Sequence, residues 1–299
     1  MYADAHAHIH DPRLARDASG RETVLERATQ SGLDLILAAT VSPDDWHALD
    51  KFLATASVRI WGTPSARTGT EVQPSVGDQP GRAQPVRESS VPKAPSPAPL
   101  TGVQIATAFG LHPAYDDGSY DAARDGFPPA ALRPHAIGEI GLDHTVNTPL
   151  DRQCTRLAMM LELASQTGLP VVLHARGPWN RLLAVLDAFP SVRGIVHAFG
   201  GSPETACELS RRGYLLSAGP RLLDPSARRM RESFSGLPLE AIVLESDAPD
   251  MCPPDEVPPN EPAVVARLAG ALAALRGEPA ETIAAETRRN LVRLLAGKG

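Results

Sequence analysis

Six residues of metal-ligand type are spread along the 299-residue chain, each within or directly after a short apolar run. His6 and His8 form a His-x-His pair near the N-terminus. Residues i and i+2 of a strand share a face, so both imidazoles can reach one ion. A single histidine of this kind is more often a capping or buried side chain than a ligand. Six candidates from five runs instead favour a metal centre: His6, His8, Glu139, His174, His197 and Asp247.

The apolar runs that carry these residues alternate with amphipathic segments along the chain. Eight runs predict strands, at 2–6, 33–40, 103–111, 135–141, 169–174, 193–198, 213–218 and 241–247. The clearest helix is predicted at 150–167, and others start at Arg21, Pro43, Trp179, Pro203 and Asp224, with two more near Glu261 and Ala280. Eight strand–helix units predict an α/β fold, a closed (β/α)₈ TIM barrel. In that fold, ligand-type residues at the C-terminal ends of strands form the active site.

The domain organisation follows from one break in this pattern. Residues 64–100 are rich in Pro, Ser, Gly, Gln and Arg, a composition that buries too little apolar surface to offset the entropy of ordering. The barrel pattern resumes afterwards. We therefore predict one TIM-barrel domain over 1–299 with a disordered insertion at 64–100. A second Pro-rich stretch, 249–262, is predicted to be an ordered active-site loop.

Composition restricts the function classes. The net charge is −6, so the chain lacks the basic footprint of a protein that binds long nucleic acid, although an enzyme can hold a strand end through metal ions. The three cysteines are widely spaced and imply no disulfide framework. The N-terminus lacks the features of a signal peptide, and no run is long enough to span a bilayer. We predict a cytoplasmic protein with no membrane contact and no obligate protein partner.

Seven short motifs then point to a known family. Their ordered set resembles the TatD family of deoxyribonuclease-like hydrolases: Asp-Ala-His-Ala-His at 4–8, Gly-Leu-His-Pro at 110–113, Gly-Glu-Ile-Gly-Leu-Asp at 138–143, Leu-His-Ala-Arg at 173–176, His-Ala-Phe-Gly-Gly at 197–201, Glu-Ser-Asp-Ala-Pro at 245–249 and Asn-Glu-Pro at 260–262. The resemblance implies a metal-dependent hydrolase, often a DNase, on a (β/α)₈ barrel. It also implies that His6, His8 and Asp247 hold one metal, that His174 and His197 hold a second, and that Glu139 bridges both.

Further roles follow from the chemistry of the neighbouring residues. Asp247 is the expected proton acceptor, and Asp4 and Glu245 are expected to orient liganding histidines. His112 and Arg176 are candidate substrate contacts. His, Glu and Asp ligands without Cys suit Zn²⁺, Mn²⁺, Co²⁺ or, less well, Mg²⁺. The chain departs from the family pattern at Ala114, where members often carry His, and at His144, where an aromatic residue is common. Both positions are expected to line the substrate cleft.

These observations predict a phosphodiesterase that acts on DNA ends or small phosphodiesters with a water activated by two metal ions. The same ligand set also supports an amidohydrolase-type enzyme that cleaves a cyclic amide or lactone, because a fold and a metal site do not fix the substrate. A third hypothesis is a non-catalytic barrel that recruits a partner through the Pro-rich insertion. The complete ligand set argues against it.

Overall fold

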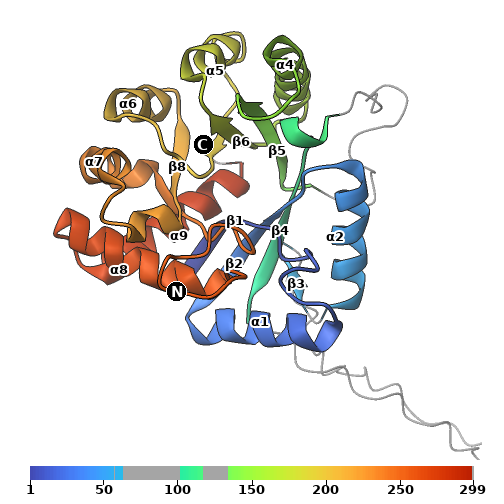
Figure 1. The fold of residues 1–299 in the computed structure, drawn as a ribbon, viewed down its shortest axis with the longest axis vertical. Coiled ribbons are helices and arrows are strands. Elements are labelled where there is room, and N and C mark those ends of the chain that lie inside the picture. The colour runs from blue at the N-terminus through green and yellow to red at the C-terminus, as the bar shows by residue number, and fades with distance from the viewer. Residues whose placement is uncertain (57, 63–101, 117–133, 298–299) are drawn as a thin grey trace, which may run out of the picture.

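The computed structural model describes residues 1–56, 58–62, 102–116 and 134–297, and in it helices surround a barrel of parallel strands (Figure 1). The barrel order is β1-β2-β4-β5-β6-β7-β8-β9. The first and last strands are joined at their C-terminal ends, where two backbone hydrogen bonds run from Asp247 N to His6 O at 2.9 Å and from His8 N to Ala248 O at 2.7 Å. The strands are β1 (Tyr2–Ala7), β2 (Leu33–Ala39), β4 (Gln104–Phe109), β5 (Ala136–Asp143), β6 (Val171–Arg176), β7 (Gly194–Val196), β8 (Tyr214–Ala218) and β9 (Ile242–Leu244).

Among the described residues, helices α1 to α7 lie between successive strands, as expected for β/α units, and α8 and α9 follow the last strand. They are α1 (Ala18–Gln30), α2 (Pro43–Thr55), α4 (Leu150–Thr167), α5 (Trp179–Leu186), α6 (Pro203–Arg211), α7 (Arg228–Gly236), α8 (Val265–Arg276) and α9 (Ala280–Leu295). Side-chain caps fix several starts. Asp17 accepts a hydrogen bond from Gly20 N at the start of α1, and Ser42 and Ser202 cap α2 and α6. The predicted (β/α)₈ barrel is therefore confirmed, and α4 has the predicted bounds.

Some boundaries differ from the prediction. An extra short strand, β3 (Arg59–Ile60), pairs with β4. Strands β7 and β9 end early, so His197 and Asp247 lie beyond them, whereas Glu139 and His174 lie inside β5 and β6. The backbone after the two short strands is left-handed at Ala198 (φ 45°) and Asp247 (φ 56°), a conformation that cannot continue a strand. Helices α1 and α7 begin at residues other than the predicted Arg21 and Asp224, and α8 begins at Val265, near Glu261 as predicted.

Two apolar clusters make up the core. The larger one lies between the strands and the surrounding helices. The smaller one draws alanine, leucine, isoleucine and valine side chains from all eight barrel strands, together with Leu291 and Leu295 of α9. Asn290 of α9 also donates to Leu239 O and Ile242 O, at the start of β9. Helix α9 therefore closes the barrel end at which the strands begin, opposite the predicted active site.

Glycines allow the strands around Glu139 and His174 to approach closely. A Cβ at Gly110 would lie 2.3 Å from the backbone N of Glu139. A Cβ at Gly141, where φ is +152°, would lie 1.9 Å from the carbonyl oxygen of His174. Side chains cannot be accommodated at these separations, so the two glycines of the conspicuous sequence motifs set the spacing of the central strands.

The segment 64–100, predicted as a disordered insertion, lies outside the described residues, and the single-domain organisation over 1–299 stays a prediction. The stretch 249–262, predicted as an ordered active-site loop, is described, and its Asp250 lines the cavity above the barrel. Within the described part of the chain, no helix is long and apolar enough to cross a membrane.

Candidate metal centre

The two carboxylate oxygens of Glu139 face two different sets of ligand-type atoms. Oε2 lies 3.3 Å from His6 Nε2 and 3.8 Å from His8 Nε2. Asp247 Oδ1 lies on the same side, 3.5 Å and 3.7 Å from these two nitrogens. On the other side, Oε1 lies 3.0 Å from both His174 Nδ1 and His197 Nε2. All six residues predicted as ligands thus converge around the carboxylate of Glu139.

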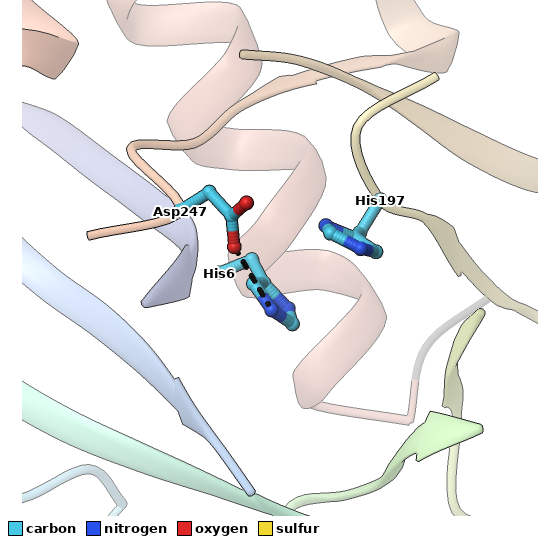
Figure 2. A group of neighbouring side chains, drawn as sticks. All are labelled: His6, His197 and Asp247. Carbon is cyan, nitrogen blue, oxygen red and sulfur yellow. Dashed lines mark ion pairs between the residues drawn. The ribbon is translucent and has the colours of Figure 1, made fainter. Parts of the chain in front are cut away.

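The separations are those expected around small divalent ions. Ligand bonds of about 2.1 Å in a tetrahedral site place neighbouring ligand atoms about 3.4 Å apart. The observed 3.0–3.8 Å between donor atoms matches that spacing on both sides of Glu139. The rings of His6 and His197 also stack, with centroids 4.2 Å apart, so the two sides adjoin. Figure 2 shows Asp247 above His6, with His197 beside them.

Hydrogen bonds orient two of the histidines so that a lone pair points to Glu139. His8 Nδ1 contacts the carbonyl oxygen of Ala39 at 3.0 Å, which places the ring hydrogen there and leaves Nε2 unprotonated. His174 Nε2 contacts Asp143 Oδ2 at 3.0 Å, which leaves Nδ1 as its lone-pair atom. These are the tautomers that metal ligation requires.

His112 differs from both, because it points its ring hydrogen, not a lone pair, toward Glu139. Its Nδ1 accepts a hydrogen bond from Ala114 N at 3.1 Å, so its ring hydrogen is on Nε2. That nitrogen lies 3.5 Å from Glu139 Oε1. His112 therefore presents a donor to the site rather than a lone pair, which fits a substrate contact and not a ligand.

A buried polar atom without a partner gives an independent test of fit. His6 is fully buried, and its Nε2 has no hydrogen-bond partner although it faces two carboxylates. An unpaired buried nitrogen is costly unless another group binds it. A cation between His6 Nε2 and the two carboxylates would satisfy all three groups.

Burial and mutual charge shift the pKa values of the residues at this centre. Burial lowers the pKa of His6 and of His112 to about 4, which keeps both rings neutral. Burial raises the pKa of Asp247 well above its ordinary value, and Glu245 and Glu139 add to this. For Glu139, burial is outweighed by the surrounding histidines, which hold its pKa well below the usual range. Glu139 is thus ionised, and Asp247 is an unusually basic carboxylate.

The two carboxylates predicted to orient histidines have different partners. Glu245 Oε1 lies 3.5 Å from His197 Nδ1 and accepts a hydrogen bond from Ala198 N at 2.6 Å. Asp4 contacts the backbone N of His6, not its imidazole. The other contacts of Asp4 are to the backbone N and the hydroxyl of Ser246. Asp4 therefore ties β1 to the segment that carries Asp247.

A cavity of about 500 Å³ opens above the centre, in the size range of small-molecule sites. Five of the six candidate ligands line it, and so does His112, whereas His6 lies beneath them. Arg176, Ala114 and His144 are not among its described lining residues, contrary to the expectation for Ala114 and His144. Arg176 is exposed at the end of β6, and its carbonyl oxygen bonds the backbone and ring of His144.

Sequence reasoning missed several residues of the site. Asp143 ends the Gly-Glu-Ile-Gly-Leu-Asp motif, which was the available signal, yet its contact with His174 was not anticipated. Arg13 and Asp250 line the cavity and pair across 237 residues of sequence, a contact that no local pattern indicates. Tyr115 is a further lining residue, directly after the Gly-Leu-His-Pro motif.

Comparisons with known proteins agree with this site. The family described as TatD related DNase matches residues 3–296. A protein of Escherichia coli (strain K12) named uncharacterized metal-dependent hydrolase YjjV is 36% identical over 188 residues, 60% of this chain and 72% of its own. A protein of Klebsiella pneumoniae (strain 342) named 3'-5' ssDNA/RNA exonuclease TatD is 32% identical over 201 residues, 63% of this chain and 75% of its own.

Among solved structures, the crystal structure of the E. coli K12 TatD homologue YjjV superposes with a TM-score of 0.74 and 26% identity, over 98% of this chain and 97% of that one. The family match spans nearly all of the chain and includes every candidate ligand. The family match and these relatives argue against the third hypothesis, a non-catalytic barrel that only recruits a partner. The chain belongs to the TatD-related DNase family and is a hydrolase of the metal-dependent type.

Proposed function

We propose that this protein is a phosphodiesterase that hydrolyses nucleic-acid ends or small nucleotide diesters with two divalent ions held on either side of Glu139. The observation that carries the proposal is the division of ligand-type atoms between the two oxygens of Glu139, with His6, His8 and Asp247 near Oε2 and His174 and His197 near Oε1. A carboxylate that faces two such sets is suited to bridge a metal pair. The exonuclease name of the Klebsiella relative supports a phosphodiester substrate.

The ions would supply a nucleophile from water near neutral pH and would draw negative charge from the phosphate oxygens. Asp247 lines the cavity beside the nitrogens of His6 and His8, and it would accept the proton that the attacking water loses. His112 donates its Nε2 hydrogen to a phosphate or leaving-group oxygen. Asp143 and Glu245 hold the rings of His174 and His197 in place. Arg176 has no part in this proposal because it does not line the cavity.

The ligand set contains His, Glu and Asp but no Cys, which suits Zn²⁺, Mn²⁺ or Co²⁺ better than Mg²⁺. Both the number of ions and their identity are part of the proposal, as is the cytoplasmic location predicted from the sequence.

A metal analysis combined with a substrate panel tests the proposal. We expect two equivalents of a transition-type divalent ion per chain and turnover of phosphodiesters, with none for cyclic amides or lactones. Amide or lactone turnover in place of phosphodiester turnover would support the amidohydrolase-type alternative.

Removal of metal gives a readout that does not depend on activity. The candidate ligands come from four strands or strand ends and from the segment after β9, so bound ions link distant parts of the barrel. A ligand at 100 to 1,000 times its Kd stabilises the fold by about 3–4 kcal/mol. We expect chelation to lower Tm by several degrees and Zn²⁺ or Mn²⁺ to restore it. An unchanged Tm together with no detectable bound metal would contradict the metal centre.

A further inference from the structure

The described residues at the mouth of the cavity above the proposed metal centre are mostly acidic. Among its described lining residues outside the centre, the charged groups are four aspartates and one arginine: Asp11, Asp44, Asp45, Asp250 and Arg13. We call the four aspartates the aspartate rim. A groove that tracks a nucleic-acid backbone has the opposite charge, because each bound phosphate needs a cation nearby.

The arginine offsets only one of the four negative charges, and two of the aspartates already bind it. Arg13 NH1 and NH2 donate to the two carboxylate oxygens of Asp250 at 2.7 and 2.8 Å. Its Nε and NH2 donate to Asp11 Oδ2 at 3.0 and 2.7 Å. Because Asp11 and Asp250 each take two hydrogen bonds from Arg13, its guanidinium has few N–H groups left to bind a phosphate.

The other two aspartates start helix α2. Asp45 accepts hydrogen bonds from His10 Nε2 at 2.7 Å and from Val41 N at 2.9 Å, so it is part of the structure of the loop. Asp44 is exposed, and no ion pair of Asp44 is recorded within the described ranges. Asp44 is therefore the aspartate whose negative charge acts most directly on a substrate that enters the cavity.

One aromatic side chain stands at the same mouth. Tyr115 is 59% exposed, an unusual state for a large aromatic residue, and it lines the cavity. Its ring centroid lies 6.0 Å from that of His112, whose Nε2 is 3.5 Å from Glu139 Oε1. An aromatic face one side chain away from a phosphate-binding centre is suited to stack a nucleobase.

We propose that the substrates are very short oligonucleotides, dinucleotides above all, which place the single scissile phosphate at the metal centre and stack one base on Tyr115. The aspartate rim repels the phosphates that a longer strand would carry past the mouth. This inference rests on the proposed phosphodiesterase function. It narrows that function to a substrate class and names Tyr115 and Asp44 as residues that determine specificity.

The first test compares the metal-loaded enzyme on a thymidine dinucleotide and a thymidine decamer at two salt concentrations. At about 50 mM salt we expect kcat/KM to be about five- to tenfold higher for the dinucleotide, because each extra phosphate meets unscreened carboxylates. Raising salt to about 200 mM should increase the decamer-to-dinucleotide ratio. A basic groove would give a falling ratio, because phosphate binding that releases counterions weakens with salt.

The second test uses variants with matched controls. Tyr115→Ala should raise KM for the dinucleotide about tenfold while the Ki of inorganic phosphate, which has no base, stays the same. Tyr115→Phe should retain the low KM. Asp44→Asn should raise the decamer-to-dinucleotide ratio about twofold at low salt. Its control is Glu281→Gln, which removes the same charge from the first turn of α9 at the far end of the barrel and should leave the ratio unchanged.

The outcomes separate this inference from the proposed function. A decamer cleaved faster than the dinucleotide, with a ratio that falls as salt rises, would overturn the inference and leave the phosphodiesterase standing. An unchanged KM in Tyr115→Ala would overturn the stacking role. Failure to cleave either substrate with both metals bound would instead contradict the phosphodiesterase itself.

Discussion

Glu139 is the residue on which both halves of the proposed metal centre depend. One of its oxygens faces His6 and His8 and the other faces His174 and His197, and it is buried in β5 with a pKa held low by the surrounding histidines. Its backbone N–H is bonded to Thr40 O at 2.8 Å, so the chain fixes its position before any ion binds. A change of charge at this one side chain therefore affects every ligand at once.

Glu139→Gln should lose the metal pair. An amide keeps the shape but lacks the charge and the second anionic oxygen, so it is a poor bridge. We expect metal content to fall below one equivalent after dialysis and kcat to fall by at least about 10²-fold. Glu208→Gln on the surface of α6 is the control and should change neither value. A Glu139→Gln protein that retains two metals and turns over normally would show that the bridging role is wrong.

Asp247 and Glu245 have different roles although they lie two residues apart. Asp247→Asn keeps an oxygen donor but removes the base, so we expect modestly weaker metal binding and a fall in kcat of about 10²–10⁴-fold. Glu245→Gln, which contacts His197 rather than substrate, should cost about 10–100-fold. The measurement is kcat at saturating metal. A larger loss in Glu245→Gln with metal still bound would move the base to the other carboxylate.

At the scale of elements, the site depends on how closely strands β4, β5 and β6 approach. The ends of these strands are also fixed from outside the barrel. Gln153 of α4 accepts from Asp143 N at 2.8 Å and donates to Asp143 O at 2.9 Å, which clamps the end of β5. Asp143 in turn contacts His174. A helix on the outer surface thus positions His174, a ligand of the proposed second metal, through one carboxylate.

Gly141→Ala tests the strand spacing. The new methyl would lie 1.9 Å from His174 O at a φ of +152°, so β5 and β6 must separate. We expect a loss of about 3 kcal/mol or more in the free energy of unfolding, measured in urea, and weaker binding of the second metal. Gly168→Ala is the control, because its φ is +71° but nothing lies within 4 Å. It should cost about 1 kcal/mol.

The elements also show which parts of the fold a sequence can predict. Helix α4 was predicted to the residue because Leu157, Met160, Leu161 and Ala164 form one buried stripe. The start of α7 was not, because Asp224 forms a local turn with Ser226 and the helix begins four residues later. The candidate ligands were predictable because each lies in a short local motif. The aspartate rim could not be predicted, because its members are far apart in the sequence. Asp250, for example, contacts Arg13 across 237 residues, and only the closure of the barrel brings the two together.

At the scale of the whole molecule, described strands pair with each other on the two sides of residues 63–101, which the structure does not describe. Strand β3 pairs in parallel with β4, Arg59 opposite Gln104 and Ile60 opposite Ile105. Trp61 N also donates to Ile105 O at 2.9 Å. The two sides of the gap are therefore joined by hydrogen bonds that do not depend on the intervening residues. They lie at the start of β4, the end of the barrel remote from Glu139.

Replacing residues 65–98 with a Gly/Ser linker of about six residues should leave Tm within about 2 °C and kcat nearly unchanged. The reason is that closing a shorter loop changes the entropy of folding only slightly, and the composition of 64–100 offers few apolar side chains to the core. A control replacement that extends from residue 59 to 98 also removes β3 and should lower Tm clearly, since the pairing with β4 is lost. Thermal melts and turnover on one substrate measure both. A large fall in Tm or turnover for the shorter replacement alone would mean that the segment contributes packing or substrate contacts, which its composition does not predict.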